Sequence, residues 1–173
     1  NKGYTLLNIL GLAVGFASVL YISLYINNEL TYDSFLPVSD RIFRTSDKEY
    51  ALTSVRHLEY TRENLPGVTH TTLVLNSGNM TIGVGENKFV ERNFLFATEG
   101  FFNVFEYETV SGSFQEFSEI SNGVVLSESL AKQFFGTEEA LNNDISIYTG
   151  SEPYSYKVIA VIKDLPENTH MKF

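Results

Sequence analysis

The sequence predicts an α+β fold with one N-terminal transmembrane helix, followed by a domain whose helices pack against a mostly antiparallel sheet. Three observations predict this class. An uncharged apolar run lies near the start of the chain. The rest of the chain is polar, acidic and long enough for a core of its own. Within that part, segments with the two-residue period of strands alternate with segments of helical period.

The apolar run extends from Tyr4 to Asn28, between Lys2 and Glu29. Its 23 residues from Tyr4 to Ile26 would form a helix of about 34 Å, and a hydrocarbon core is about 30 Å thick. The run is apolar on every side and has tyrosines near both ends, as a membrane span does. A buried core helix and a cleaved signal peptide stay open as alternatives, although the run is longer than a usual signal and lacks a small-x-small cleavage site.

We therefore expect residues 1–28 to form a transmembrane helix with a short cytoplasmic flank and residues 29–173 to form the domain. Lys2 is the only charge ahead of the apolar run, so the positive-inside rule leaves the N-terminus in the cytoplasm and exports the acidic part. The formal net charge of −9 argues against nucleic acid as a partner. The absence of cysteine removes disulfides, zinc thiolates and thiol nucleophiles.

The domain's expected elements follow from local patterns. A polar connector broken by Pro37 leads to a strand over about 41–48, and a helix then covers 53–67 up to Pro66-Gly67. Strands are expected over 68–75, 80–84 and 89–97, with a turn at 76–79. The later elements are a helix within 98–108, a strand over 124–126, a helix between Ser127 as N-cap and Gly136 as stop, and a hairpin of 144–148 with 154–165.

Several apparent chemical motifs have simpler explanations. Ser129-x-x-Lys132 fits a pattern of penicillin-recognising enzymes, but the accompanying S-D-N and K-T-G motifs are missing. His57, His70 and His170 lack the spacing of a metal site. Gly83-x-Gly85 falls in a strand and turn, where it cannot cradle a phosphate. The sequence therefore predicts no catalytic residue, metal site or cofactor.

Four blocks of the chain carry a resemblance to a known family. The stretch "NKGYTLLNILGLAVGFASVLYISLYINNELTYDSF", followed by "DRIFR", resembles the first transmembrane helix of MacB/FtsX-type ABC transporter permeases of the Bacteroidota type. The blocks "EGFFNVFEYETVSGSF", "NGVVLSESLAKQFFG" and "YKVIAVIKDLPENTHMKF" resemble the MacB-like periplasmic core domain in the same order. Residues 53–91 match only in pattern, and Ala140-Leu141-Asn142 replaces the family's Pro-Ile-Gly.

The resemblance implies a non-enzymatic permease subunit in the bacterial inner membrane, with its domain in the periplasm. Its implied partners are a cytoplasmic ABC ATPase that hydrolyses ATP, membrane lipid, a second permease half or copy, and a periplasmic partner protein. The periplasmic domain would couple ATP hydrolysis to export, extraction or signalling. The family's domain continues beyond the end of this sequence, so we expect an N-terminal fragment of such a permease.

Two sets of residues are candidates for roles in such a protein. Gly11 and Gly15 form a small-residue pair for close helix packing. Residues 27–39 would transmit movement, with Asp33, Pro37, Asp40 and Arg41 holding the geometry by capping, rigidity and ion pairing. A ligand-sensing domain of a membrane-anchored receptor is the alternative class, and it would enclose a pocket with convergent polar groups. A membrane-tethered hydrolase would need a catalytic set that this sequence does not supply.

Overall fold

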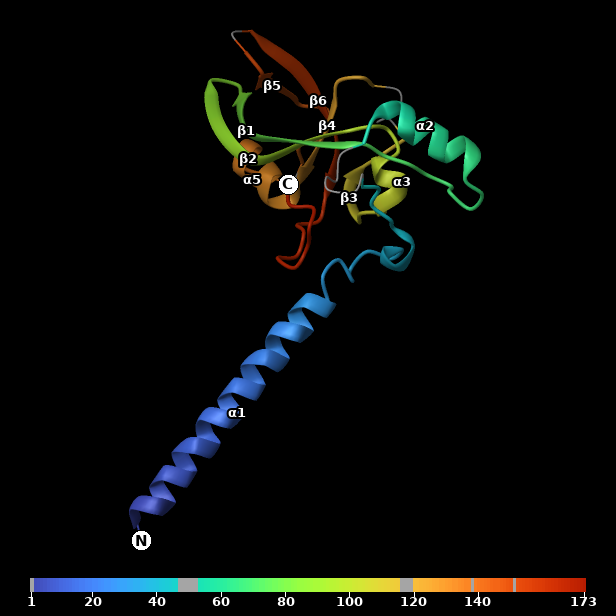
Figure 1. Ribbon diagram of the computed structural model, residues 1–173. Coiled ribbons are helices and arrows are strands. Elements are labelled where there is room, and N and C mark those ends of the chain that lie inside the picture. The colour runs from blue at the N-terminus through green and yellow to red at the C-terminus, as the bar shows by residue number, and fades with distance from the viewer. Residues whose placement is uncertain (1, 47–52, 116–119, 138, 151) are drawn as a thin grey trace. The chain divides into compact units, whose positions relative to one another are not determined.

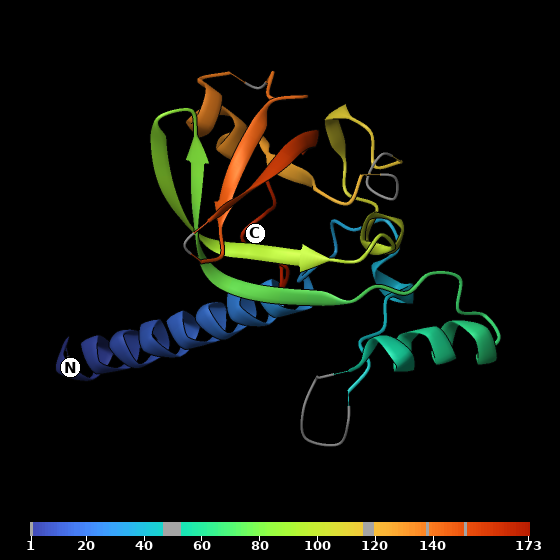
Figure 2. The same ribbon diagram turned by 90° about the horizontal axis from the view of Figure 1, so that it is seen from above.

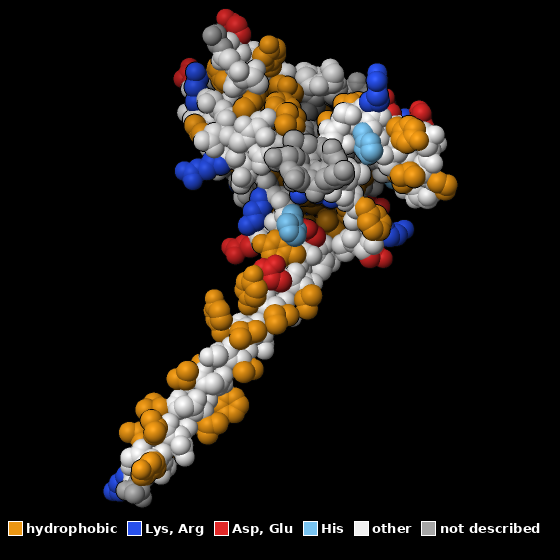
Figure 3. Space-filling model, in the orientation of Figure 1, with side chains coloured by type: hydrophobic (Ala, Val, Ile, Leu, Met, Phe, Trp, Pro, Cys, Tyr) orange, Lys and Arg blue, Asp and Glu red, His pale blue; other side chains and the backbone are white. Residues whose placement is uncertain are grey.

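A computed structural model describes residues 2–46, 53–115, 120–137, 139–150 and 152–173. The chain forms two units: residues up to Phe35 with Pro166–His170, and Leu36–Leu165 with Met171–Phe173. The first unit contains α1 (Lys2–Leu30), which is apolar all around and exposed along its length (Figures 1 and 3). In the described part of the chain, it is the one helix long and apolar enough to cross a membrane.

The second unit is built on a sheet with short helices. Its elements are η1 (Ser39–Arg41), α2 (Val55–Asn64), β1 (Val74–Val84), β2 (Asn87–Ala97), α3 (Phe101–Phe105), β3 (Thr109–Gly112), β4 (Gly123–Ser127), α5 (Glu128–Phe135), β5 (Asp144–Tyr148) and β6 (Pro153–Ile162). Within the described residues the sheet has six strands in the order β2-β1-β5-β6-β3, and β4 also pairs with β6. All pairings are antiparallel except that of β4 with β6. The predicted α+β class is confirmed.

The β1–β2 hairpin is longer than the sequence suggested (Figure 2). The predicted turn at 76–79 is wrong, because β1 continues through it with register shifts on both sides of Gly78. The side chain of Asn76 accepts a hydrogen bond of 2.8 Å from the Gly78 N–H, so the turn chemistry produces a bulge instead. The chain reverses between Val84 and Asn87, where Gly85 has a φ of 57°.

Two other strand predictions fail for lack of a neighbouring strand. Residues 68–73 are irregular, and β1 begins only at Val74. Residues 42–46 also form no strand, while 47 and 48 lie outside the described residues. Ile42 packs against the second core, but residues 43–46 are all exposed, so the inside-outside alternation of a strand is absent as well.

Helix α5 follows its sequence signals closely. The Ser127 side chain accepts a hydrogen bond from the Leu130 N–H, and Gly136 ends the helix with a φ of 73°. Ala131 and Phe134 are buried in the main core with residues of β1, β4, β5 and β6. Helix α2, also predicted, covers a shorter range than expected and is largely exposed.

A second core, here called the aromatic cluster, surrounds α3. Its buried members are Leu36, Phe101, Phe102, Tyr107 and Ile162, and Leu165, Met171 and Phe173 pack against them. Phe101 lies 5.9 Å from Phe173 between ring centroids, and Phe102 stacks on Phe114 at 3.9 Å. The residues that directly follow Phe35, precede Pro166 and follow His170 all belong to this cluster.

Candidate functional site

Residues 31–35 and 166–170, here called the helix-exit joint, meet just beyond α1. The last carbonyl groups of a helix have no partner within the helix. Thr31 satisfies two of them, because its Oγ1 donates to Asn27 O at 2.9 Å and to Asn28 O at 3.1 Å. The half-buried Asn168 then donates its Nδ2 to Thr31 O at 3.0 Å and contacts Thr31 Oγ1 at 3.3 Å. A distant side chain thus completes the end of α1.

Asp33 is the centre of the joint. Its Oδ1 accepts hydrogen bonds from Thr169 Oγ1 at 2.6 Å and from the His170 N–H at 3.1 Å, and its Oδ2 lies 2.6 Å from His170 Nδ1. The Asp33 N–H donates to Asn168 O at 3.0 Å. One residue therefore binds three consecutive residues of the remote segment through its side chain and backbone.

The backbone of Asp33 is in the left-handed region, with a φ of 54°. This conformation is unfavourable for most residues with a side chain, although Asp and Asn tolerate it best. Thr169, which is 2% exposed, donates a hydrogen bond from its hydroxyl to the Asp33 carboxylate. The hydrogen bonds of the joint thus hold a backbone geometry that the local sequence does not favour.

The electrostatics of Asp33 follow from these contacts. Burial would raise the pKa of Asp33, but hydrogen bonds from Thr169 and His170 and the charge of the imidazole outweigh it, so the pKa lies below its ordinary value. The His170 ring packs against Tyr32 at 4.6 Å between centroids and its side chain is 73% exposed. The joint therefore keeps an ionised carboxylate at the end of the apolar helix.

The other candidate residues of the predicted transmission segment belong to the second unit. Pro37 is exposed and follows the buried Leu36, while Asp40 and Arg41 are exposed in η1. Within the described ranges, neither Asp40 nor Arg41 forms a salt bridge. No role was predicted for Asn168 and Thr169 from the sequence. The signal that could have identified them is that they lie in a polar run between the apolar residues Leu165 and Met171.

Gly11 and Gly15 lie one helical turn apart on the exposed surface of α1. Apart from the chain neighbours and the backbone of α1 itself, no atom of the described residues lies within 4 Å of the position that a Cβ would take at either glycine. Their role in helix packing stays a prediction.

Two polar contacts hold the residues that follow β6, just ahead of residue 166 in the sequence. Lys163 forms an ion pair of 2.6 Å with Glu108, and Asp164 Oδ1 accepts a hydrogen bond of 3.0 Å from the Ser129 N–H at the start of α5. Hydrogen bonds from Ser129 and Ser127 and the charge of Lys132 keep the pKa of Asp164 below its ordinary value, although burial opposes them. Ser129 of the Ser-x-x-Lys motif thus takes part in capping a helix.

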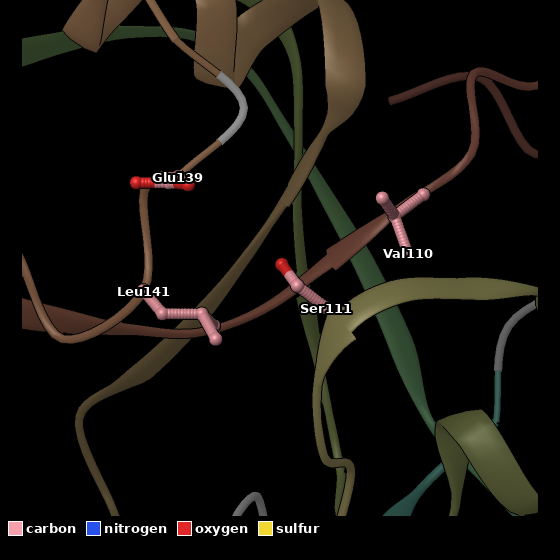
Figure 4. Close-up of a pocket in the computed structure, with 4 residues that line it drawn as sticks. All are labelled: Val110, Ser111, Glu139 and Leu141. Carbon is pink, nitrogen blue, oxygen red and sulfur yellow. The ribbon is translucent and has the colours of Figure 1, made fainter.

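The remaining candidate features are modest. A hollow of about 470 Å³ is lined by Val110, Ser111, Glu139 and Leu141 (Figure 4). The Oγ of Ser111 is buried there without a hydrogen-bond partner among the described residues, and Glu139 is exposed. His57 and His70 are exposed. In the described ranges, no three His, Cys, Asp or Glu residues are grouped as metal ligands.

An apolar helix followed by an α+β domain is the architecture of a membrane-anchored domain, and comparisons with known proteins give its family. The model of the MacB-like periplasmic core domain matches residues 5–173. The chain therefore belongs to the family of MacB-like periplasmic core domains, which are parts of ABC transporter permeases. Membership implies a membrane-anchored protein with its domain in the periplasm, and α1 fits such an anchor. No curated protein matches the sequence.

Solved structures resemble the chain at low sequence identity. A domain of a putative permease from Porphyromonas gingivalis is 22% identical with a TM-score of 0.57, over 66% of this chain and 48% of that one. The periplasmic region of MacB from Actinobacillus actinomycetemcomitans is 20% identical with a TM-score of 0.46, over 61% of this chain and 50% of that one. The extracellular domain of the noncanonic ABC-type transporter YknZ from Gram-positive bacteria is 19% identical with a TM-score of 0.49, over 65% of this chain and 58% of that one. The chain thus spans about half the length of these domains.

Proposed function

We propose that this protein is a permease subunit of an ABC transporter of the MacB/FtsX type in the bacterial inner membrane. A separate cytoplasmic ATPase would hydrolyse ATP, and a second permease half or copy would complete the membrane part. The periplasmic domain would turn that hydrolysis into export, extraction or signalling through a periplasmic partner. Family membership supports the class of protein, and the helix-exit joint supports the coupling role.

The observation that carries the coupling proposal is the pair of hydrogen-bond sets that Asn168 and Thr169 make to Thr31 and Asp33. A tilt or rotation of α1 would act on two chain segments at once, because 31–35 and 166–170 are bonded to each other. Both segments continue directly into residues of the aromatic cluster. We therefore expect a displacement of α1 to reach the aromatic cluster through both of these chain segments. For this reason we add residues 166–170 to the predicted transmission segment 27–39. Asp33 is the residue that we expect to matter most for transmission.

A ligand-sensing domain is less well supported. The hollow beside β3 offers one buried hydroxyl and one exposed carboxylate, which is fewer polar groups than a specific ligand site usually brings together.

The class of protein is tested by expressing the full permease with the ATPase encoded beside it and reconstituting both in nanodiscs. Co-elution and ATP hydrolysis that depends on the permease would support the proposal. Separate elution, together with a small molecule that raises the melting temperature of the domain, would overturn it in favour of the sensor.

The coupling role is tested by Asp33→Ala in the same complex. We expect ATP hydrolysis to continue while the periplasmic conformational change that follows it is lost. Asp40→Ala is the matched control, since it removes an exposed carboxylate a few residues away. Full coupling in Asp33→Ala would contradict the proposal.

A further inference from the structure

Exposed rings lie near the end of α1 and in the helix-exit joint. Tyr25 of α1 is 58% exposed, Phe35 of the joint is 39% exposed, and the side chain of His170 in the joint is 73% exposed. All three residues belong to the same unit. Aromatic rings with a polar edge are enriched where a span leaves the hydrocarbon.

The length of the span places this surface at headgroup depth. Residues 4–26 cover the hydrocarbon core of about 30 Å, and each headgroup layer adds roughly 5–8 Å. At about 1.5 Å per residue, Thr31 lies about 7 Å beyond Ile26 along the helix axis. Asn168, Thr169 and His170 are hydrogen-bonded to Thr31 and Asp33 and so lie at nearly the same level.

The exposed charges of the two segments are acidic. Glu29 and Glu167 are exposed, whereas the ionised Asp33 is paired with His170. Neither Lys nor Arg occurs in residues 27–35 or 166–170. Anionic lipids attract basic segments and are repelled by acidic ones. Exposed carboxylates instead attract an ammonium group.

We propose that the helix-exit joint binds the headgroup layer of the bilayer and selects zwitterionic lipids with an ammonium group over anionic lipids. Exposed rings of Tyr25, Phe35 and His170 lie among the headgroups, and Glu29 and Glu167 set the preference. Residues 166–170, which follow the last strand in the sequence, thereby contact lipid. This inference rests on α1 spanning the membrane and is independent of any coupling to an ATPase.

The depth of the joint is tested by tryptophan fluorescence, because the 173 residues contain no Trp. Phe35→Trp is introduced into the full chain in nanodiscs, with lipids brominated either near the glycerol or near the end of the acyl chain. Val14→Trp, in the middle of α1, is the matched control. We expect shallow bromine to quench Phe35→Trp more strongly, with the opposite order for Val14→Trp. Quenching of Phe35→Trp by aqueous acrylamide alone would overturn the proposal.

The lipid preference is tested with the same Phe35→Trp chain. Phosphatidylethanolamine and phosphatidylglycerol, each brominated near the glycerol, are compared at equal mole fraction. We expect stronger quenching by the ethanolamine lipid, and the order should reverse when Glu29→Lys and Glu167→Lys are combined. Equal or stronger quenching by phosphatidylglycerol in the chain with both glutamates would refute the preference.

Discussion

Thr169 donates a hydrogen bond of 2.6 Å to the carboxylate of Asp33, a residue 136 positions earlier in the chain. The bond joins the first polar turn after the apolar helix to the segment that follows the last strand, β6. Because Thr169 is 2% exposed, its hydroxyl has little access to water as a replacement partner. This contact therefore makes Asp33 the residue on which the integrity of the joint depends most.

Removing the Asp33 side chain should open the joint without unfolding the sheet. Asp33→Ala leaves the Thr169 hydroxyl and the His170 N–H without their acceptor, at a cost of about 1–3 kcal/mol. Hydrogen exchange of the His170 amide should accelerate, while β5 and β6 should keep their protection. Asp33→Asn keeps an acceptor and tolerates the positive φ, so its effect should be smaller. Equal protection of His170 in Asp33→Ala would contradict this prediction.

The stability of the joint should fall in acid. The folded-state pKa of Asp33 lies below its ordinary value of 3.8, so the carboxylate stabilises the joint above that value. This contribution should be lost as the pH falls below the ordinary value and through the folded pKa. Protection factors of the His170 amide, measured from neutral pH down to acid, should show the loss, and Asp33→Asn should flatten the profile. An unchanged profile in Asp33→Asn would show that another group is responsible.

The end of α1 should fray when Asn168 is changed. Asn168→Ala removes the donor to Thr31 O, which we expect to cost about 1 kcal/mol. Asn168→Asp should be worse, because it places a negative charge at the negative end of the helix dipole. Amide exchange of Thr31, whose N–H donates to Asn27 O, reports the fraying. Equal exchange in the two variants would mean that the dipole has no influence here.

Bulky residues at Gly11 or Gly15 should weaken assembly and leave the isolated chain helical. A Cβ at either position meets nothing within 4 Å beyond the helix's own backbone and chain neighbours, so we expect α1 to accommodate Gly11→Ile. It would prevent the close approach of a neighbouring transmembrane helix. The cross-linking yield between permease helices should fall in Gly11→Ile. Val14→Ile replaces one bulky residue by another, so it should leave the yield unchanged. An undiminished yield in Gly11→Ile would exclude a packing role for this face.

Alanine substitutions at two glycines distinguish the cost of a steric clash from the cost of backbone strain. A Cβ at Gly112 would clash with the backbone oxygen of Ile159, whereas a Cβ at Gly78 meets nothing within 4 Å beyond its chain neighbours, and both residues have a positive φ. Gly78→Ala should cost about 1–2 kcal/mol from strain alone. Gly112→Ala should cost clearly more, because the chain must also shift. Urea unfolding of the two variants gives the comparison, and equal losses would contradict the predicted clash.

The sequence predicted elements whose signals are local. Ser127 and Gly136 define α5 through a cap and a left-handed stop, and the alternation in 144–148 defines β5. Patterns that need a distant partner were misassigned. Residues 42–46 were predicted as a strand but have no ladder, and Asn76 and Gly78 form a bulge because β2 pairs on both sides of them.

The candidate site also combines a local signal with partners that are distant in the sequence. Asp33 could be chosen from the sequence as a polar residue after a membrane span. Its partners could not, since Thr169 and His170 contact the Asp33 carboxylate, and Asn168 contacts the Asp33 N–H through its backbone carbonyl, from positions more than 130 residues away in the sequence. Asp40 and Arg41 have equally suitable side chains and lie outside the joint. Residue type therefore indicated the kind of contact but not its position.

We expect α1 and residues 166–170 to move together. Spin labels are attached at Ile26→Cys and Glu167→Cys in the complex with its ATPase, after any cysteines outside these 173 residues have been replaced. We predict one narrow distance distribution, identical with and without ATP, that broadens in Asp33→Ala. A distance that changes with ATP while Asp33 is intact would contradict the claim.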